Sequence, residues 1–187
     1  MLFIIIGCLA FLFLYIFDIN KVKFIHKNLN ICFAVGVLLL AFSTIGILFH
    51  DSKSFEIYLP LRVLFGVLSI IALVLMLHAL FYSLPFKETY IEVEKRNKVI
   101  DTGMYALSRH PGVLWFFLFY FFLWLAWGKM IIMWAGIVWT IMDIIHVYVQ
   151  DRWLFPKALI DYDKYKDKVP FLIPSIRSIK QFMMTIK

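Results

Sequence analysis

Residues 111–149 read PGVLWFFLFYFFLWLAWGKMIIMWAGIVWTIMDIIHVYV, and this stretch decides the fold. It contains two apolar runs, at residues 113–127 and 130–149, separated only by Gly128 and Lys129. A helix needs about 20 predominantly apolar residues to cross the hydrocarbon core of a bilayer, so each run is a candidate membrane span. A connection of two residues forces the chain to reverse direction at once. It therefore predicts a tight antiparallel helical hairpin.

Three further apolar runs precede this hairpin, at residues 2–17, 29–49 and 57–84. The chain is 63% hydrophobic and 17% charged, with a mean hydropathy of +0.87, whereas soluble globular domains are about 45–50% apolar. This composition excludes a water-soluble fold and predicts an all-α integral membrane protein with about five transmembrane helices. The runs at 2–17 and 113–127 are the shortest. We expect them to borrow flanking residues or to cross where the bilayer thins.

The 19 Lys and Arg residues are distributed unevenly. Sixteen of them lie in three places: at Lys21, Lys23 and Lys27 between the first two runs, between residues 86 and 112, and after residue 149. The others are Lys53, Arg62 and Lys129. Because Lys and Arg are enriched in cytoplasmic loops, we expect the N-terminus outside and the C-terminal segment in the cytoplasm. The many Ile, Lys and Phe residues are typical of an AT-rich bacterial genome, so the expected location is a bacterial inner membrane.

The segment before the fourth run reads VIDTGMYALSRHPG, at residues 99–112. Arg109 and His110 stand directly before the apolar run, and Pro111 suits the first turn of a helix, where its missing N–H is harmless. Two cations at a helix start oppose the helix dipole, so the pair predicts an anionic ligand or lipid headgroup nearby. On its own, the pattern fits a basic membrane anchor equally well.

After the fifth run the chain reads QDRWLFPKALIDYDKYKDKVPFLIP, at residues 150–174. The two segments together resemble the isoprenylcysteine carboxyl methyltransferase and phospholipid methyltransferase superfamily of integral membrane enzymes. The family pattern LVxxGxYxxxRHPxY is matched in register at Val99, Gly103, Tyr105, Arg109, His110 and Pro111. The residues that fall on the second pattern, EExxLxxxFGxxYxxYxxxVPxxxP, are Arg152, Leu154, Tyr162, Tyr165, Val169, Pro170 and Pro174. The resemblance covers roughly residues 98–174.

The resemblance implies methyl transfer from S-adenosylmethionine, held at the cytoplasmic face, to a lipophilic acceptor such as an isoprenoid carboxylate, a phenol or an amino-lipid. Arg109 and His110 are implied to act in catalysis. The cofactor-binding residues that it implies are Tyr105, Arg109, His110, Pro111, Gln150, Asp151 and Arg152. The chain is then one membrane domain, in which residues 1–84 form three spans, 85–174 form the methyltransferase-like core and 175–187 form a basic tail.

This sequence departs from the family pattern at several positions. Asn97 stands where a His is usual, Val113 where a Tyr is usual, and Gln150–Asp151 where two Glu are usual. Asp151 keeps one carboxylate for the cofactor's positively charged sulfonium or amino group. The lost polar groups predict a more apolar acceptor side, lined by Val113, Trp115 and Phe116, and leave open a member with another acceptor or with no activity.

The fifth run carries polar residues at helical spacing. Asp143, His146 and Gln150 follow at i, i+3 and i+7, which places them on one face of a helix. Ionisable residues at membrane depth are costly and usually face a cavity or a partner. We therefore predict His146 as a catalytic residue, with the Asp143–His146 pair able to take a proton from an amine or phenol acceptor. The alternative is a structural pair that connects helices.

Two other functions stay open at this stage. Membrane reductases of the steroid 5α-reductase type share a similar element before a span but bind NADPH. A protein with a decayed pocket would bind lipid headgroups or a partner through its basic face, and the basic tail is expected at anionic headgroups in any case. We expect no nucleic-acid partner. We also expect no metal site, because five scattered His and two Cys give no ligand spacing. A homodimer is left open.

Overall fold

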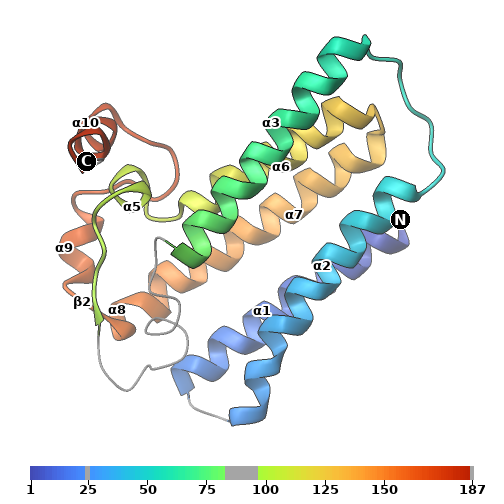
Figure 1. Ribbon diagram of the computed structural model, residues 1–187. Helices are drawn as coiled ribbons and strands as arrows, with labels where there is room; N and C mark the ends of the chain where they lie inside the picture. Colours follow the sequence, from blue (N-terminus) through green and yellow to red (C-terminus); the bar gives the residue numbers. More distant parts are fainter. Residues whose placement is uncertain (24–25, 83–96, 186–187) are drawn as a thin grey trace. The chain divides into compact units, whose positions relative to one another are not determined.

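The computed structural model describes residues 1–23, 26–82 and 97–185. In this part, four helices are long and apolar enough to cross a membrane: Leu2–Lys21, Lys27–Phe49, Leu59–Phe81 and Met130–Ala158. The chain is thus an all-α membrane protein (Figure 1). The predicted polar segment 85–112 is described only from residue 97, and Asn97 is described for its backbone alone.

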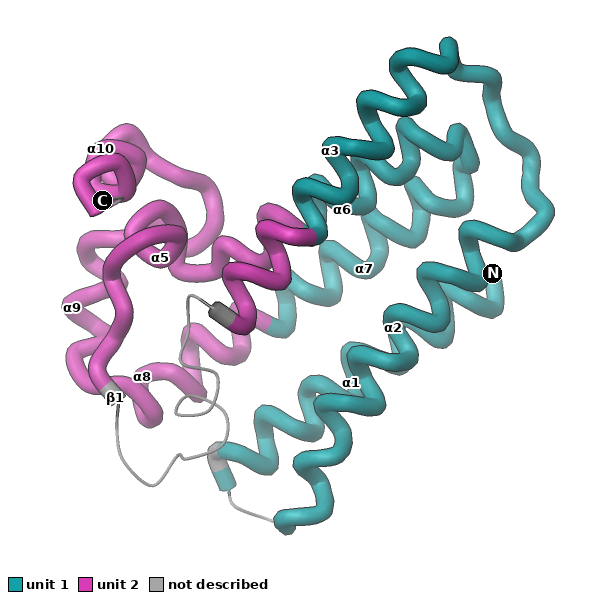
Figure 2. The backbone as a smooth tube through the Cα atoms, in the orientation of Figure 1, with its two compact units in different colours: residues 1–73, 116–146 teal, residues 74–115, 147–187 magenta. Residues whose placement is uncertain are grey.

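The chain divides into two compact units (Figure 2). Unit 1 comprises Met1–Leu73 and Phe116–His146, and unit 2 comprises Val74–Trp115 and Val147–Lys187. Helices α1 (Leu2–Lys23) and α2 (Ile31–Phe49) belong wholly to unit 1, whereas α3 (Leu59–Leu77), α6 (Pro111–Trp127) and α7 (Met130–Val149) contribute residues to both units.

The long helices follow the apolar runs of the sequence. α1 spans Leu2–Lys23, the 3-10 turn η1 spans Lys27–Asn30, α2 spans Ile31–Phe49, α3 spans Leu59–Leu77, α6 spans Pro111–Trp127 and α7 spans Met130–Val149. With 17 residues, α6 is about 25 Å long, which is less than the roughly 30 Å of a typical hydrocarbon core. Pro111 is its first residue, as the sequence predicts.

Helix α1 is longer than the apolar run that predicts it, because the polar residues after Phe17 find partners. The Nε2 atom of His146 lies 2.6 Å from Oδ2 of Asp18. The side chain of Asn20 accepts a hydrogen bond from the backbone N–H of His26 at 2.8 Å and donates one to its carbonyl at 2.9 Å. Buried polar groups that are hydrogen-bonded do not end a helix, so α1 continues to Lys23.

The helices of unit 1 approach one another closely. The indole of Trp139 occupies the space in which a Cβ atom at Gly7 would lie, and its Nε1 donates to the carbonyl of Ile4 at 3.0 Å. The hydroxyls of Thr44 and Tyr120 are 2.6 Å apart. Lipid is as apolar as a leucine side chain, so helices in a bilayer associate mainly through close packing and interhelical hydrogen bonds of this kind.

The connection between α6 and α7 is tied to the end of α2. Gly128 has φ of +67°, a backbone conformation that favours glycine. The ammonium group of the next residue, Lys129, donates to the carbonyls of Leu48 at 2.8 Å and His50 at 2.9 Å. These carbonyls lie at the C-terminal end of α2, where a cation also interacts favourably with the helix dipole.

Unit 2 is built from short elements, and its cluster of buried side chains is Phe155, Tyr162, Tyr165 and Val169. The elements are the π turn η2 (His78–Tyr82), β1 (Asn97–Lys98), α5 (Met104–Leu107), the π turn η3 (Gln150–Leu154), α8 (Phe155–Ala158), β2 (Leu159–Ile160), α9 (Tyr162–Lys166) and α10 (Ile176–Thr185). The two strands pair in parallel, with Asn97 opposite Leu159. Segments far apart in the sequence therefore meet in this unit.

Candidate functional site

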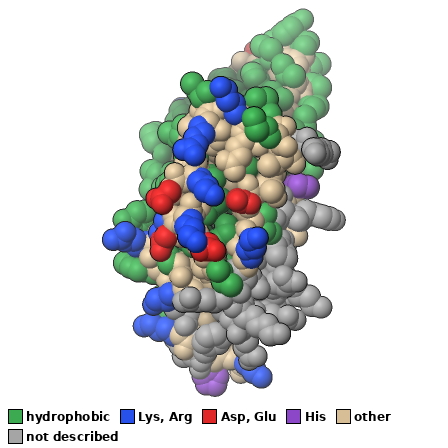
Figure 3. All heavy atoms as spheres, turned by 90° about the vertical axis from the view of Figure 1, so that its left-hand side faces the viewer, with side chains coloured by type: hydrophobic (Ala, Val, Ile, Leu, Met, Phe, Trp, Pro, Cys, Tyr) green, Lys and Arg blue, Asp and Glu red, His purple; other side chains and the backbone are tan. Residues whose placement is uncertain are grey.

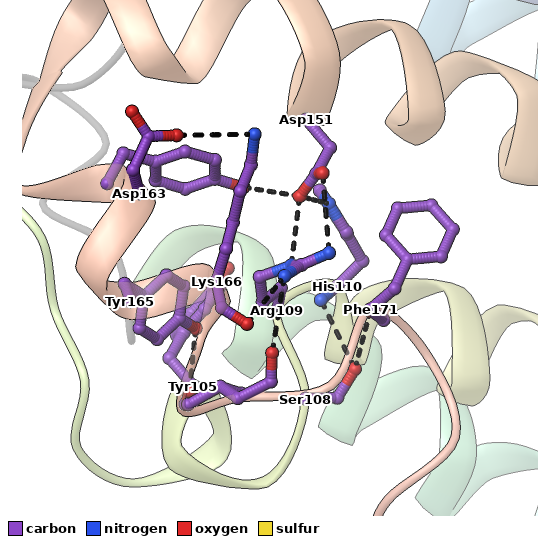
Figure 4. Close-up of polar contacts among 11 residues, drawn as sticks. Tyr105, Ser108, Arg109, His110, Asp151, Asp163, Tyr165, Lys166 and Phe171 are labelled. Atoms are coloured by element: carbon purple, nitrogen blue, oxygen red, sulfur yellow. Dashed lines mark hydrogen bonds and ion pairs between the residues drawn. The ribbon is translucent and has the colours of Figure 1, made fainter.

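The RHP segment lies against the C-terminal segment of unit 2 (Figure 4). The backbone of Ser108 is extended, and its hydroxyl donates to the carbonyl of Phe171 at 3.1 Å. The same hydroxyl accepts a hydrogen bond from the backbone N–H of His110 at 3.3 Å. The backbone N–H of Arg109 donates to the carbonyl of Pro170 at 3.0 Å. The two segments that carry the family resemblance are therefore joined through their backbones.

The guanidinium group of Arg109 reinforces this junction. Its Nη1 donates to the carbonyls of Lys166 at 3.1 Å and Val169 at 3.3 Å, and its Nη2 donates to Oδ2 of Asp151 at 3.4 Å. Its Nε lies 3.0 Å from Oδ1 of Asp151, an ion-pair contact in which the N–H is not aligned for a hydrogen bond. Each of the two side chains is only 12% exposed, so water screens this pair weakly.

Asp151 is the centre of the network. Besides the contacts with Arg109, its Oδ1 accepts a hydrogen bond from the hydroxyl of Tyr162 at 2.6 Å and lies 3.3 Å from Nε2 of His110. A buried carboxylate is costly unless it is paired and hydrogen-bonded, and here both oxygens have protein partners. The geometry therefore makes Asp151 an anchor that fixes Arg109 and His110.

Aromatic rings enclose the imidazole of His110, whose side chain is 5% exposed. The ring of Phe155 is stacked on it at a centroid distance of 5.9 Å, and the ring of Phe171 meets it edge-on at 5.0 Å. The guanidinium carbon of Arg109 lies 5.7 Å from the centroid of Phe171, in a cation–π contact. These rings hold the side chains of Arg109 and His110 in one orientation.

The tyrosines of the two segments connect them further. The hydroxyl of Tyr105 donates to the carbonyl of Ala79 at 3.1 Å, and the hydroxyl of Tyr165 donates to the carbonyl of Tyr105 at 2.6 Å. Burial raises the pKa of Tyr165 above its ordinary value. Burial raises the pKa of Tyr162 as well, and the adjacent Asp151 carboxylate raises it further. Both phenols are therefore neutral hydrogen-bond donors at neutral pH.

The remaining predicted cofactor residues lie in different surroundings. Pro111 is buried at the start of α6, and Gln150 is buried at the start of η3. Arg152 is exposed, so the structure brings it to the surface. Gln150, Asp151 and Arg152 all lie on a π turn, a departure from α-helical geometry that is frequent at functional sites.

The predicted catalytic residue His146 belongs to unit 1, together with Asp143. Its partner there is Asp18 of α1, at 2.6 Å, and the ring of Tyr15 packs against the imidazole at a centroid distance of 4.9 Å. Asp18 was missed by the sequence analysis. The available signal was an acidic residue directly after the first apolar run, in a position where a lone carboxylate would be costly.

The predicted acceptor-side residues include one buried donor without a partner. The indole Nε1 of Trp115 is inaccessible to solvent and has no hydrogen-bond partner among the residues that the structure describes. Val113 is also buried. Phe116 belongs to unit 1, where its ring meets Phe11 at a centroid distance of 6.2 Å. A buried N–H without a partner costs free energy, and the indole Nε1 of Trp124 is in the same situation.

Within residues 1–23, 26–82 and 97–185, no group of three or more His, Cys, Asp or Glu side chains is arranged to hold a metal ion. Comparisons of the chain with protein-family models, with curated proteins and with solved structures find no match.

Proposed function

We propose that this protein is an integral membrane methyltransferase that uses S-adenosylmethionine to methylate a lipophilic acceptor at the cytoplasmic membrane face. The observation that carries the proposal is the junction of the two family-like segments. Arg109 and His110 of the first segment contact Asp151 of the second, and Ser108 is bonded to Phe171. A cofactor site built jointly by both segments requires such a junction.

The proposed topology has five spans. It adds the shorter apolar helix Pro111–Trp127 to the four long ones and makes α6 and α7 an antiparallel hairpin. Two contacts support the hairpin: the rings of Tyr120 and Trp139 lie 5.2 Å apart, and the side chain of Tyr120 lies against Gly136. With an odd number of spans and the observed charge bias, the C-terminal segment is cytoplasmic.

The donor set of unit 2 fits the polar groups of the cofactor. Arg109 and His110 carry N–H groups suited to a carboxylate or to hydroxyl oxygens, and Trp115 adds a buried N–H that has no partner in the described part of the chain. Asp151 has both oxygens engaged, so its role in this proposal is to hold Arg109 and His110 in place. Tyr105 contributes in the same way, through Ala79 and Tyr165.

When bound, the cofactor supplies a methyl group on a positively charged sulfur, which leaves as a neutral thioether as the acceptor's oxygen or nitrogen bonds to the methyl carbon. The chain contributes alignment and exclusion of water, which are worth as much as about 7–11 kcal/mol when the geometry is right. The rings of Phe155 and Phe171 shield His110 from solvent.

The acceptor determines whether a base is needed. An isoprenoid carboxylate needs none, whereas an amine or a phenol must lose a proton. In unit 2 the available base is His110, whose ring is oriented by Asp151. In unit 1 it is His146, oriented by Asp18. The variants His110→Gln and His146→Gln distinguish these two candidates. The variant that loses activity toward a phenol but keeps its activity toward a carboxylate lacks the base.

A binding titration tests the proposal directly. Purified protein in detergent is titrated with S-adenosylmethionine, S-adenosylhomocysteine and NADPH. We expect the first two to bind. Binding of NADPH alone would indicate the reductase, and binding of none of the three would indicate a decayed pocket.

A matched pair of variants locates the site. Arg109→Gln should weaken the binding of S-adenosylhomocysteine by about 1.5–3 kcal/mol, because it removes charge-assisted hydrogen bonds. Lys168→Gln removes an exposed cation of the same unit and should leave the affinity unchanged. Equal affinities in the two variants would contradict the assignment of Arg109.

The acceptor is then found by a labelled-methyl transfer screen in proteoliposomes over isoprenoid acids, phenols, amino-lipids and prenylcysteine analogues. We expect loose discrimination among apolar acceptors, because a missing methylene costs an apolar site only about 1–3 kcal/mol. Selective methylation of a zwitterionic amino-lipid would contradict an apolar acceptor side at Val113.

Reporter fusions at Lys187 test the orientation. A fluorescent reporter that functions only in the cytoplasm should be bright, and alkaline phosphatase should be inactive. The reverse result would place the C-terminal segment outside.

A further inference from the structure

Helix α10 turns its polar side toward the protein. Ser178 is fully buried, and the hydroxyl of Thr185 accepts a hydrogen bond from the backbone N–H of Gly103 at 3.1 Å. The large apolar residues lie on the opposite side, where Ile176 is 77% exposed and Met184 is 76% exposed. Met183 and Ile179 are exposed on the same side.

This arrangement is the reverse of a helix on a water-soluble protein, which buries its apolar stripe and exposes its polar one. The hydrogen bond between Gly103 and Thr185 joins the polar side of α10 to the start of α5 within unit 2. The exposed apolar stripe continues before the helix with Ile173. An apolar surface of this extent marks a contact with another apolar phase.

Two cations lie within the exposed apolar stripe. Arg177 and Lys180 are both exposed and share one side of α10 with Ile176 and Met184. Figure 3 views the molecule from the left-hand side of Figure 1 and shows Lys and Arg side chains together with Asp, Glu and hydrophobic side chains. Long cationic side chains can lay their aliphatic stems along an apolar surface and extend their charged ends to water or headgroups.

We propose that α10 lies in the interface of the bilayer, with Ile176, Ile179, Met183 and Met184 in the acyl region and with Arg177 and Lys180 at anionic headgroups. Exposed apolar residues on one side, with basic residues among them whose aliphatic stems can follow the apolar surface, suit an interfacial helix. The basic charge complements the negative surface of an anionic leaflet, where each Lys or Arg contributes about 1 kcal/mol.

The bilayer is favoured over a separate protein partner because the chain is already in the membrane. The spans anchor unit 2 covalently, so the lipid surface is present at a high effective concentration, whereas a partner would have to be recruited. This inference is independent of methyl transfer, because it rests on the exposed side of α10 and not on the Arg109–Asp151 network.

Spin labels on the full-length protein test the inference. Cys8 and Cys32 are first replaced by alanine, and a single cysteine is introduced as Met183→Cys or, as the matched exposed control, Asp163→Cys. The proteins are reconstituted into vesicles of phosphatidylcholine and phosphatidylglycerol. Collision rates are measured with oxygen, which concentrates in the acyl region, and with a water-soluble nickel complex.

We expect the ratio of oxygen to nickel collisions to be several-fold higher at position 183 than at position 163. The double substitution Arg177→Gln and Lys180→Gln should lower this ratio in vesicles with phosphatidylglycerol and leave it unchanged in pure phosphatidylcholine. Equal ratios at positions 183 and 163 would overturn the proposal. So would spin–spin broadening at position 183, which would show a second copy of the chain on this face. A label at Ile176→Cys provides an independent repeat.

Discussion

In unit 1 the indole of Trp139 fills the space beside Gly7, whereas in unit 2 the carboxylate of Asp151 holds several short segments together. The contact between Gly7 and Trp139 depends on shape, and Trp139 adds one hydrogen bond to Ile4. The contacts of Asp151 depend on charge and reach Arg109, His110 and Tyr162. These two contacts thus stabilise their units in different ways, one through shape and the other through charge.

The difference follows from the lengths of the elements. Helices of about 20 residues in lipid satisfy their own backbone groups and need only fit against one another. Helices as short as α5, α8 and α9, with four or five residues each, are not stable alone. They need side-chain bonds to hold them, and a buried ion pair supplies such bonds at defined angles. A single substitution should therefore damage unit 2 more than unit 1.

The largest effect is expected for Asp151→Ala. It leaves the guanidinium of Arg109 buried without its carboxylate, and breaking a buried pair in this way costs about 3–5 kcal/mol. We expect faster hydrogen exchange in α9 and a lower midpoint of unfolding. The control is Asp163→Ala, which removes an exposed carboxylate 3.7 Å from Lys166. Equal exchange rates in the two variants would show that the network does not stabilise unit 2.

Tyr162→Phe should have a smaller effect that depends on pH. It removes the hydrogen bond to Asp151, a loss of about 1.5–3 kcal/mol for a bond to a charged group. Because the pKa of Tyr162 in the folded protein is raised above its ordinary value of 10, this stabilisation is present below about pH 10. It is lost as the pH rises through the folded-state pKa.

Thermal unfolding of the wild type and Tyr162→Phe between pH 7 and 11 measures this dependence. The difference in stability should be constant at lower pH and should decrease toward the alkaline end. A difference that increases with pH would mean that the ionised phenol is stabilised in the fold, contrary to the position of Asp151.

Gly7→Val tests packing in unit 1. The new side chain would overlap the indole of Trp139, and overpacking of this kind costs about 1–3 kcal/mol. The expected result is a lower unfolding midpoint in detergent, with the fluorescence of Trp139 shifted. The control is Gly66→Val, because nothing lies within 4 Å of a Cβ atom at that position. A Gly66 variant that is as unstable as the Gly7 variant would rule out a specific contact.

Thr44→Val should have the smallest effect. It removes the hydroxyl contact of 2.6 Å with Tyr120, and interhelical hydrogen bonds in membrane proteins contribute about 0.6 kcal/mol on average. A double-mutant cycle with Tyr120→Phe isolates the pair. A coupling as large as that of a cycle over Arg109 and Asp151 would contradict the contrast between the units.

Much of the fold could be predicted from the apolar runs, because a bilayer imposes the length of a span on the sequence. The structure has four long apolar helices in its described part and the shorter α6. The end of α1 could not be predicted in this way. Its continuation to Lys23 depends on Asp18, whose partner His146 lies 128 residues away in the sequence.

Three residues of the predicted site lie in contact with one another, and their binding role stays a prediction. Arg109, His110 and Asp151 come together in unit 2 as the paired segments suggested. The sequence could not show that Asp151 is saturated by protein groups, because this depends on α9 bringing the hydroxyl of Tyr162 to within 2.6 Å of it. Asp143 and His146 belong to unit 1. Their shared helical face could not show that His146 pairs with Asp18 of another helix.

The long separation between Asp18 and His146 has a consequence for synthesis in the cell. A ribosome that adds about 5–20 residues per second needs about 6–26 s to reach His146 after Asp18 has been made. During this interval α1 is exposed to the insertion machinery with a carboxylate that still lacks this partner. The contact between α1 and α7 therefore forms only after α7 has been made, so assembly of unit 1 is completed after residue 146 has been added.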